Sequence, residues 1–339
     1  CLSLYEDLLQ RFTEWVGEAL PTTAALMSRV LASYMDHMFF EGEELHMGTK
    51  TLAAVFHRFP YMGRGNKHAL SEARQALAGW KKLNPPKARL ALPWELVARI
   101  ITLMVEDGEL MMALITALCF HGYLRPGVAL ALRWDQLTPP LVRGRLDGKR
   151  SVGSLRLWAL NLHQFEEKIP SKTGTFDETI ELGDVASWRW IGRVLDAANE
   201  LRQNQGIPDS APLADFSMAK WTKTFVKKGE MAGFPRKEIL HLYALRHGGA
   251  SHDAGNKLRP MLEVQKRGSW RTTTSVCRYS KPGRLNQVLS LVNTEQRAAV
   301  MRSSAALPEL ICGAFRDRLA KSSTSLPVSG RKRKAGSWR

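Results

Sequence analysis

The sequence has few cysteines and no long apolar run. Its four cysteines are scattered, and neither a Cys pair nor a Cys/His cluster has zinc-site spacing; they are Cys1, Cys119, Cys277 and Cys312. Such thiols are typical of a reduced, intracellular protein. No apolar run approaches the roughly 18 residues of a membrane span, and the richest stretch, residues 110–120, predicts a buried helix.

Acidic residues are scarce relative to basic ones. The chain of 339 residues has 49 Lys and Arg against 32 Asp and Glu, a formal net charge of +17. This excess favours a polyanionic partner, with nucleic acid first and an acidic membrane surface second. A soluble protein that is simply basic is the plainer interpretation. No convincing carboxylate cluster is present, and at 44% apolar residues the chain can bury real cores.

Residues 1–85 are expected to form a helical module. Apolar residues recur at helical spacing over 2–12, 21–35, 51–59 and 70–83. With its glycine-rich basic loop at 63–68, the module either clamps a duplex or is an ordinary helical bundle. A Pro-Pro break within a run of positive charge makes residues 81–89 the best linker candidate. The first residue is Cys rather than Met, so we expect the natural N-terminus to lie upstream.

Residues 86–300 are expected to form a second domain, mostly α with a small antiparallel β-sheet near residues 135–182. Strands are predicted over 155–165 and 179–182. Helices are predicted over 94–105, 110–120, 128–132, 185–203, 215–232, 236–251, 257–267 and 271–279. Residues 301–339 are expected to form a basic tail with one helix over 310–319. The tail's RKRK at 331–334 indicates a nuclear-import signal or a loose nucleic-acid tether.

Two basic residues lie at predicted turns. Arg125 stands in Leu-Arg-Pro-Gly before a helix, and its guanidinium fork matches two phosphate oxygens at once. Lys172 stands in Ser-Lys-Thr-Gly between strand-like segments, where a lysine can reach into a groove and donate a proton. Taken alone, each is more often an ordinary solvated charge.

Three further candidates share one predicted helix. Tyr243, Arg246 and His247 fall at three- and four-residue spacing, so they share a face that offers several phosphate donors. The alternative is a partly buried amphipathic helix with a structural histidine.

The last candidates are Trp270 and Tyr279, nine residues apart. The indole N–H of Trp270 either donates to a phosphate oxygen or simply packs. Tyr279 follows Arg278 and precedes a break at Lys-Pro-Gly. A tyrosine hydroxyl is a weak nucleophile near neutral pH because its pKa is about 10. Neighbouring groups must therefore stabilise the charge that develops as it attacks.

Together these motifs resemble the tyrosine recombinase (phage integrase) family. Leu-Arg-Pro, Ser-Lys-Thr-Gly, Leu-Arg-His, and a Trp with Arg-Tyr nine residues on occur in the order seen in that family. The resemblance covers about residues 90–300. Residues 1–85 look like the family's helical, SAM-like core-binding domain, which binds DNA.

The resemblance implies DNA strand cleavage and rejoining through a 3′-phosphotyrosyl intermediate. The reaction serves site-specific recombination or integration, here of a mobile element. Arg125 and Arg246 would clamp the scissile phosphate, and Tyr279 would attack it. Lys172 would protonate the leaving 5′ oxygen. No metal or cofactor is implied, because Arg and Lys supply the positive charge.

Two positions depart from the family pattern. The residue three positions after the first arginine is usually acidic and here is Val128. The residue three positions before the second arginine is usually His and here is Tyr243, which donates a hydrogen bond but is a poor base near neutral pH. By the same resemblance, His247 and Trp270 would position or stabilise the phosphate.

The implied partner is double-stranded DNA, bound by a homotetramer on two duplexes without a membrane. Residues 285–301 are the candidate for a C-terminal helix exchanged between protomers. The location would be nuclear in a eukaryote and with the nucleoid otherwise. Two alternatives stay open: a catalytically impaired DNA-binding protein with the same fold, and a type IB topoisomerase-like enzyme that works without synapsis.

Overall fold

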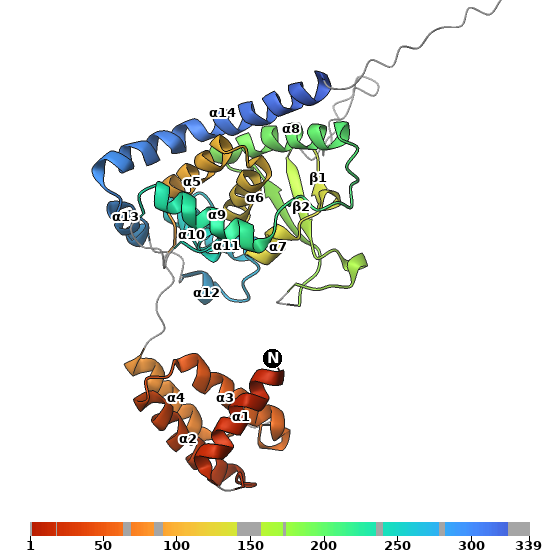
Figure 1. Cartoon of the computed structure of the whole chain (residues 1–339). Coiled ribbons are helices and arrows are strands. Elements are labelled where there is room, and N and C mark those ends of the chain that lie inside the picture. Colours follow the sequence, from red (N-terminus) through yellow and green to blue (C-terminus); the bar gives the residue numbers. More distant parts are fainter. Residues whose placement is uncertain are drawn as a thin grey trace, which may run out of the picture. The chain divides into compact units, whose positions relative to one another are not determined.

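A computed structural model of the chain describes residues 2–17, 19–63, 69–84, 91–140, 157–171, 174–234, 240–277 and 282–324. The chain divides into two compact units, Cys1–Ala88 and Arg89–Arg339 (Figure 1). Two predicted site residues, Lys172 and Tyr279, lie outside the described residues, as do most of the 63–68 loop and the RKRK segment.

The described part of the first unit is a small helical bundle. Its helices are α1 (Leu2–Val16), α2 (Ala24–Phe40), α3 (Leu45–Arg58), the short 3-10 helix η1 (Pro60–Met62) and α4 (Ser71–Leu83). Their apolar faces meet around Phe12, Met27, Leu31 and Trp80, which are all buried. Helix α3 begins six residues earlier than the apolar pattern predicts, because Leu45 and Met47 also pack against this core.

The second unit is mostly helical. Its α-helices are α5 (Trp94–Glu106), α6 (Leu110–His121), α7 (Pro126–Leu130), α8 (Trp190–Asn204), α9 (Met218–Met231), α10 (Tyr243–Gly255), α11 (Met261–Arg267), α12 (Thr273–Cys277), α13 (Pro282–Ser290) and α14 (Thr294–Thr324). Short 3-10 helices are η2 (Trp134–Gln136), η3 (Phe165–Glu167) and η4 (Ala186–Trp188). Helices α5 and α6 form its apolar centre, where nearly every side chain of α6 is buried.

A small antiparallel sheet flanks these helices. Its strands are β1 (Leu137–Thr138), β2 (Trp158–Leu162) and β3 (Glu178–Leu182), in the order β1-β2-β3. Leu160 pairs with Leu137 on one side and with Ile180 on the other, and both Leu160 and Ile180 are buried. The prediction of a mostly α fold with a small antiparallel sheet is confirmed, although β2 is shorter than the segment expected at 155–165.

Helix α14 is longer than predicted. It runs through Pro308 and packs along α5 and α8, as Figure 1 shows for α8. An internal proline costs a helix about 3 kcal/mol. Burial of a large apolar side chain contributes about 1.5–3 kcal/mol, and α14 buries Val300, Leu307, Ile311 and Phe315, so packing outweighs the proline. Residues 301–324 therefore belong to the helical layer of the second unit, and the helix predicted over 310–319 is only part of α14.

Residues 285–301, expected to be an exchanged element, pack on their own unit. Helix α13 lies against α10, and Val288, Val292 and Val300 are buried in the core of the same unit.

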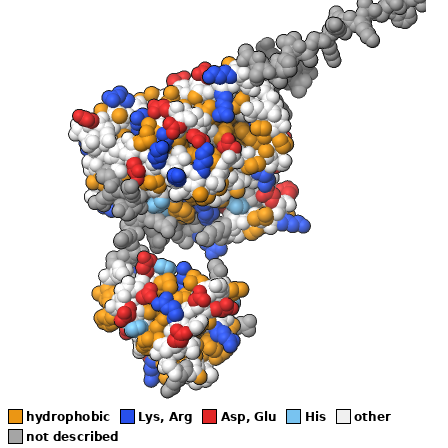
Figure 2. Space-filling view, in the orientation of Figure 1, with side chains coloured by type: hydrophobic (Ala, Val, Ile, Leu, Met, Phe, Trp, Pro, Cys, Tyr) orange, Lys and Arg blue, Asp and Glu red, His pale blue; other side chains and the backbone are white. Residues whose placement is uncertain are grey.

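Two surface properties bear on partners. Among the side chains drawn in Figure 2, basic, acidic and hydrophobic ones are interspersed rather than gathered into one patch of a single charge. Within the described ranges, no helix has the length and apolar character needed to cross a membrane.

Candidate active site

Residues distant in the sequence converge on one hollow of the second unit. Arg125 and Val128 reach it from the start of α7, Arg246 from α10, and Glu178 from β3. The remaining lining residues are Tyr123, Leu124, Leu162, His163, Ile180, Arg267 and Ser269. The structure thus brings together the two arginines that the sequence singled out, 121 positions apart by subtraction of their numbers.

The Leu-Arg-Pro motif explains the position of Arg125. A residue before proline is pushed out of the helical region, and proline fits the first position of a helix. Arg125 accordingly has an extended backbone, with φ −70° and ψ 138°, and Pro126 opens α7. The half-buried side chain of Arg125 therefore leaves the chain at the edge of the hollow.

Arg246 is held by two backbone carbonyls and one aromatic ring. It is 4% exposed, and its guanidinium donates to the carbonyl oxygens of Tyr123 and Gly268. Its Cζ lies 4.5 Å from the centroid of the Trp270 ring. Stacking and forked hydrogen bonding fix the plane of a guanidinium, so the orientation of Arg246 is set by the fold itself.

Glycines permit the close approach that this arrangement needs. A Cβ at Gly249 would lie 1.9 Å from the carbonyl oxygen of Phe120, and one at Gly248 would lie 2.4 Å from that of Leu92. A Cβ at Gly268 would lie 1.8 Å from the Trp270 ring. The close packing around α10 therefore requires glycine at positions 248 and 249, and the position of the Trp270 ring requires glycine at position 268.

The other predicted residues of α10 and the following turn lie next to Arg246. Tyr243 begins α10, and its ring centroid is 5.3 Å from that of the buried His247, as their helical spacing predicts. The half-buried Trp270 packs between Arg246 and the ring of Tyr123, whose centroid is 6.2 Å away. The ring of Trp270 therefore packs, and donation by its indole N–H to a phosphate oxygen stays a prediction.

Lys172 and Tyr279 are not placed. Their neighbours in the chain are described: Ser171 and Gly174 flank the lysine, and helices α12 and α13 precede and follow the tyrosine. Their membership of the site therefore remains a prediction.

A buried polar network beneath the hollow was not found from the sequence. Asp253 of α10 accepts hydrogen bonds from Tyr123 Oη and from Arg259. Asp184 accepts two bonds from Arg259 and a longer one, 3.5 Å, from Arg267. Arg267 also donates to the carbonyl oxygen of Glu181 and approaches His121 Nε2 at 2.8 Å.

Nothing local in the sequence signals this network. Tyr123 and Asp253 are 130 positions apart, and Asp184 and Arg259 are 75 apart. These ion pairs are almost fully buried, so removal of one partner would leave an uncompensated charge. Tyr123, whose carbonyl holds Arg246, is thereby fixed at both its backbone and its hydroxyl.

Burial shifts the proton equilibria of the network. Burial, and then the charges of Arg267 and Arg259, lower the pKa of His121 far below its usual value. The ring is therefore neutral, and its 3.5 Å approach to Asp184 is not an ion pair. Burial and the neighbouring Arg259 also lower the pKa of Arg267 to about 10, so this guanidinium stays charged near neutral pH.

Glu178 is the one carboxylate among the residues that line the hollow. Burial alone would raise its pKa, but hydrogen bonds from Ser269, Thr175 and Ser171 outweigh burial and hold the pKa below its usual value. The carboxylate therefore stays charged well into mild acid. Three guanidinium groups bordering one hollow outnumber it, an arrangement suited to an oxyanion such as a phosphodiester. Within the described residues, no group of three or more His, Cys, Asp or Glu is arranged to hold a metal ion.

Comparison with known proteins rests on structure. No family model matches the sequence, and none of the curated proteins matches it. A crystal structure of the XerH site-specific recombinase bound to palindromic difH substrate, a post-cleavage complex, matches with a TM-score of 0.54 at 15% sequence identity. The match covers 85% of this chain and 78% of that one. A pre-cleavage complex of XerH with difH gives a TM-score of 0.41 at 13% identity, covering 84% of this chain and 88% of that one.

The match extends over most of this chain. At this identity a likeness concerns the backbone arrangement alone. The chain has a tyrosine recombinase fold.

Proposed function

We propose that this chain cleaves and rejoins double-stranded DNA by metal-independent transesterification in site-specific recombination or integration, as an enzyme of a mobile element. The observation that carries the proposal is the convergence of Arg125 and Arg246 on one hollow, within a tyrosine recombinase fold. The sequence motifs that led to the two arginines also single out Lys172 and Tyr279.

In the proposed mechanism, the scissile phosphate binds at the hollow and is held by Arg125 and Arg246. Tyr279 Oη attacks the phosphorus, its proton leaves to solvent or a nearby base, and the bond to the 5′ oxygen breaks. Lys172 gives that oxygen a proton, and a 3′-phosphotyrosyl bond is formed. Attack by a 5′ hydroxyl of another strand reverses these steps. The guanidinium groups stabilise the charge that builds on the non-bridging oxygens.

The fixed orientation of Arg246 supports this role. A donor already held by Tyr123, Gly268 and Trp270 needs little reorganisation as charge develops on the phosphate. His247 and Tyr243 lie beside it on α10 and would position the same phosphate. The proposed assembly is a homotetramer on two duplexes, with the first unit as a second DNA-binding module. The proposed location is the nucleus or the nucleoid.

A second candidate is a catalytically impaired DNA-binding protein of the same fold. Val128 favours it, because this side chain packs against the apolar core instead of presenting a carboxylate to the hollow. Tyr243 favours it as well, because a tyrosine is a poor base near neutral pH.

One experiment separates the two. The protein is incubated with labelled duplexes that carry a nick just downstream of many candidate cleavage positions, so that cleavage traps the intermediate. A denaturing gel then detects a covalent adduct. We expect an adduct with the wild type and with Tyr61→Phe, an exposed tyrosine of the first unit, but none with Tyr279→Phe. Absence of any adduct where binding is demonstrable would favour the non-catalytic protein.

Salt dependence tests DNA binding itself. If phosphate contacts dominate, the logarithm of the association constant falls steeply and linearly with the logarithm of salt concentration. Fluorescence anisotropy of a labelled duplex at several salt concentrations measures the slope, and Arg125→Gln should make it shallower. An association constant that does not change with salt concentration would contradict both candidate functions.

A further inference from the structure

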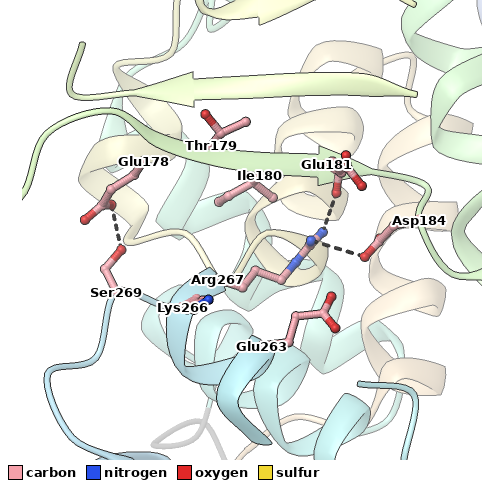
Figure 3. A pocket seen from close by; sticks show the side chains of 9 residues that line it. All are labelled: Glu178, Thr179, Ile180, Glu181, Asp184, Glu263, Lys266, Arg267 and Ser269. Atoms are coloured by element: carbon pink, nitrogen blue, oxygen red, sulfur yellow. Dashed lines mark hydrogen bonds and ion pairs between the residues drawn. The ribbon is translucent and has the colours of Figure 1, made fainter. Parts of the chain in front are cut away.

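Glu178 makes hydrogen bonds with two separate segments of the chain. Its Oε2 accepts from Ser269 Oγ at 2.6 Å, as Figure 3 shows. Its Oε1 accepts from Thr175 Oγ1, and Ser171 also hydrogen-bonds to this carboxylate. Glu178 is half-buried at the first position of β3, where the chain comes out of the Ser171/Thr175 segment.

The first segment flanks Lys172 in the sequence. Ser171 N donates to Thr175 O at 2.8 Å, Gly174 N donates to Ser171 O at 2.8 Å, and the two hydroxyl oxygens lie 2.6 Å apart. Ser171 is 4% exposed, although serine is usually found at the surface. The hydrogen bonds to Glu178 thus tie a closed and partly buried turn to the start of β3.

The second segment holds Arg246. Ser269 lies between Gly268, whose carbonyl accepts from Arg246, and Trp270, whose ring stacks on it. Ser269 has a φ of +49°, in the left-handed region that costs a residue other than glycine about 1 kcal/mol or more. Its hydrogen bond to Glu178 helps to hold it there.

The charge of Glu178 suits this place. Helix α7 offers only the apolar Val128 to the hollow that Glu178 shares with Arg125, Arg246 and Arg267. Hydrogen bonds to a charged acceptor are roughly twice as strong as neutral ones. A carboxylate here therefore gives firmer anchoring to both segments than an amide would.

We propose that Glu178 is a positioning residue of this site, which ties the Ser171/Thr175 segment to the 268–270 turn that orients Arg246. The effect of Glu178 on DNA cleavage rests on the proposed function. The effect of Glu178 on the two segments does not rest on it, because the hydrogen bonds exist in the free protein.

The matched pair of variants is Glu178→Gln and Glu181→Gln. Both residues lie on β3 and border the pocket drawn in Figure 3, but Glu181 accepts its hydrogen bond from Arg267 through its backbone oxygen. Each variant replaces one carboxylate by an isosteric amide. Ser269→Ala removes the other partner of the 2.6 Å hydrogen bond.

Amide hydrogen exchange in the free, full-length protein tests the structural part. In Glu178→Gln we expect exchange at Ser171, Gly174 and Trp270, whose amides are all hydrogen-bonded, to become about tenfold faster, while Glu181→Gln matches the wild type. Equal exchange in the two variants would overturn the proposal.

Covalent adduct formation on nicked duplexes tests the chemical part. We expect Glu178→Gln to bind duplex within about twofold of the wild type, while its rate of adduct formation at saturation falls on the order of 10- to 100-fold. The double variant with Ser269→Ala should be little slower than Glu178→Gln alone, because Glu178→Gln already weakens the hydrogen bond that Ser269→Ala removes. A Glu178→Gln rate equal to that of Glu181→Gln would overturn the proposal. If the wild type itself formed no adduct, the proposed function would fail, and hydrogen exchange alone would decide the role of Glu178.

Discussion

The guanidinium of Arg246 lies over the ring of Trp270, 4.5 Å from Cζ to the ring centroid, so the tryptophan is a platform for the arginine. A stacked cation gains about 0.5–2 kcal/mol, and stacking fixes the plane in which its donors point. Trp270→Phe keeps an aromatic face, whereas Trp270→Ala removes it.

We therefore expect Trp270→Ala to form the DNA adduct on the order of 10- to 100-fold more slowly than the wild type, and Trp270→Phe to lose much less. The two rates on one nicked duplex, at equal occupancy, measure the difference. Similar losses in both variants would show that Trp270 acts through its indole N–H rather than as a platform.

The close packing of α10 against α6 gives a prediction about stability. Gly249→Ala would place a methyl group 1.9 Å from the carbonyl oxygen of Phe120, which is backbone and yields little. We expect a loss of about 1–3 kcal/mol in the free energy of unfolding, as for other overpacked sites. Gly313→Ala in α14, where nothing lies within 4 Å, is the control and should be neutral or stabilising. Urea unfolding of both variants is the measurement, and equal stability would contradict this packing.

The buried network gives a second prediction about stability. Asp253 is 2% exposed and accepts from both Tyr123 and Arg259. Asp253→Asn keeps the shape but leaves Arg259 with less compensating charge, so we expect a loss of about 3–5 kcal/mol. Asp317→Asn, on the exposed face of α14, should change stability by less than about 0.5 kcal/mol. A small loss in Asp253→Asn would show that water or another group takes over the role of its charge.

Short-range motifs in the sequence predicted part of this site. The extended residue before Pro126 and the single helical face of Tyr243 and His247 depend on local sterics and helical periodicity, and both are present in the structure. The order of the motifs predicted the recombinase fold, which the structural comparison confirms.

What the sequence did not reveal depends on distant contacts. Asp184 and Arg259 stand in unremarkable local patterns 75 positions apart, and Tyr123 and Asp253 are 130 apart, so these contacts exist only in the folded unit. Asp253 and Arg259 are six positions apart, which is not the three- or four-residue spacing of one helical face. The role of Glu178 could not be predicted from the sequence for the same reason, because its partner Ser269 is 91 positions away. The length of α14 was underestimated because Pro308 predicts a helix boundary, and only packing on α5 and α8 outweighs that signal.

Acid should weaken the second unit through His252. Burial, and then the charge of Arg259, lower the pKa of His252 to about 4 from its ordinary 6.5. Between these two values the unfolded chain binds a proton that the folded chain does not, so stability falls as pH falls through this window. The loss from this residue between pH 7 and pH 5 is about 2 kcal/mol. The buried His121, whose pKa is also lowered, adds a loss of the same sign.

Urea unfolding of the wild type and of His252→Asn at pH 7 and pH 5 isolates this effect. The variant should lose about 2 kcal/mol less than the wild type over that interval, whatever its stability at pH 7. His57→Asn, on an exposed helix end of the first unit, is the control and should follow the wild type. Parallel behaviour of all three proteins would mean that His252 is protonated in the folded state.

The final prediction joins Val128 to Glu178, which line the same hollow. A second carboxylate beside Glu178 would be repelled, because two nearby negative charges disfavour each other and raise the pKa of one. We therefore expect Val128→Asp alone to give no gain in adduct formation. In the Glu178→Gln background, Val128→Asp returns a single carboxylate to the hollow. This carboxylate would lie on α7, three positions after Arg125, the residue that precedes the helix. It should then recover part of the lost rate, about threefold or more, as measured on one nicked duplex at saturating protein.

Val128→Asn in that background, which adds polarity without charge, is the control and should recover nothing. Equal effects of the aspartate in both backgrounds would mean that Glu178 and position 128 act independently. Glu178 would then tie the Ser171/Thr175 segment to the 268–270 turn. It would not take the role of the acidic residue that the family pattern has three positions after the first arginine.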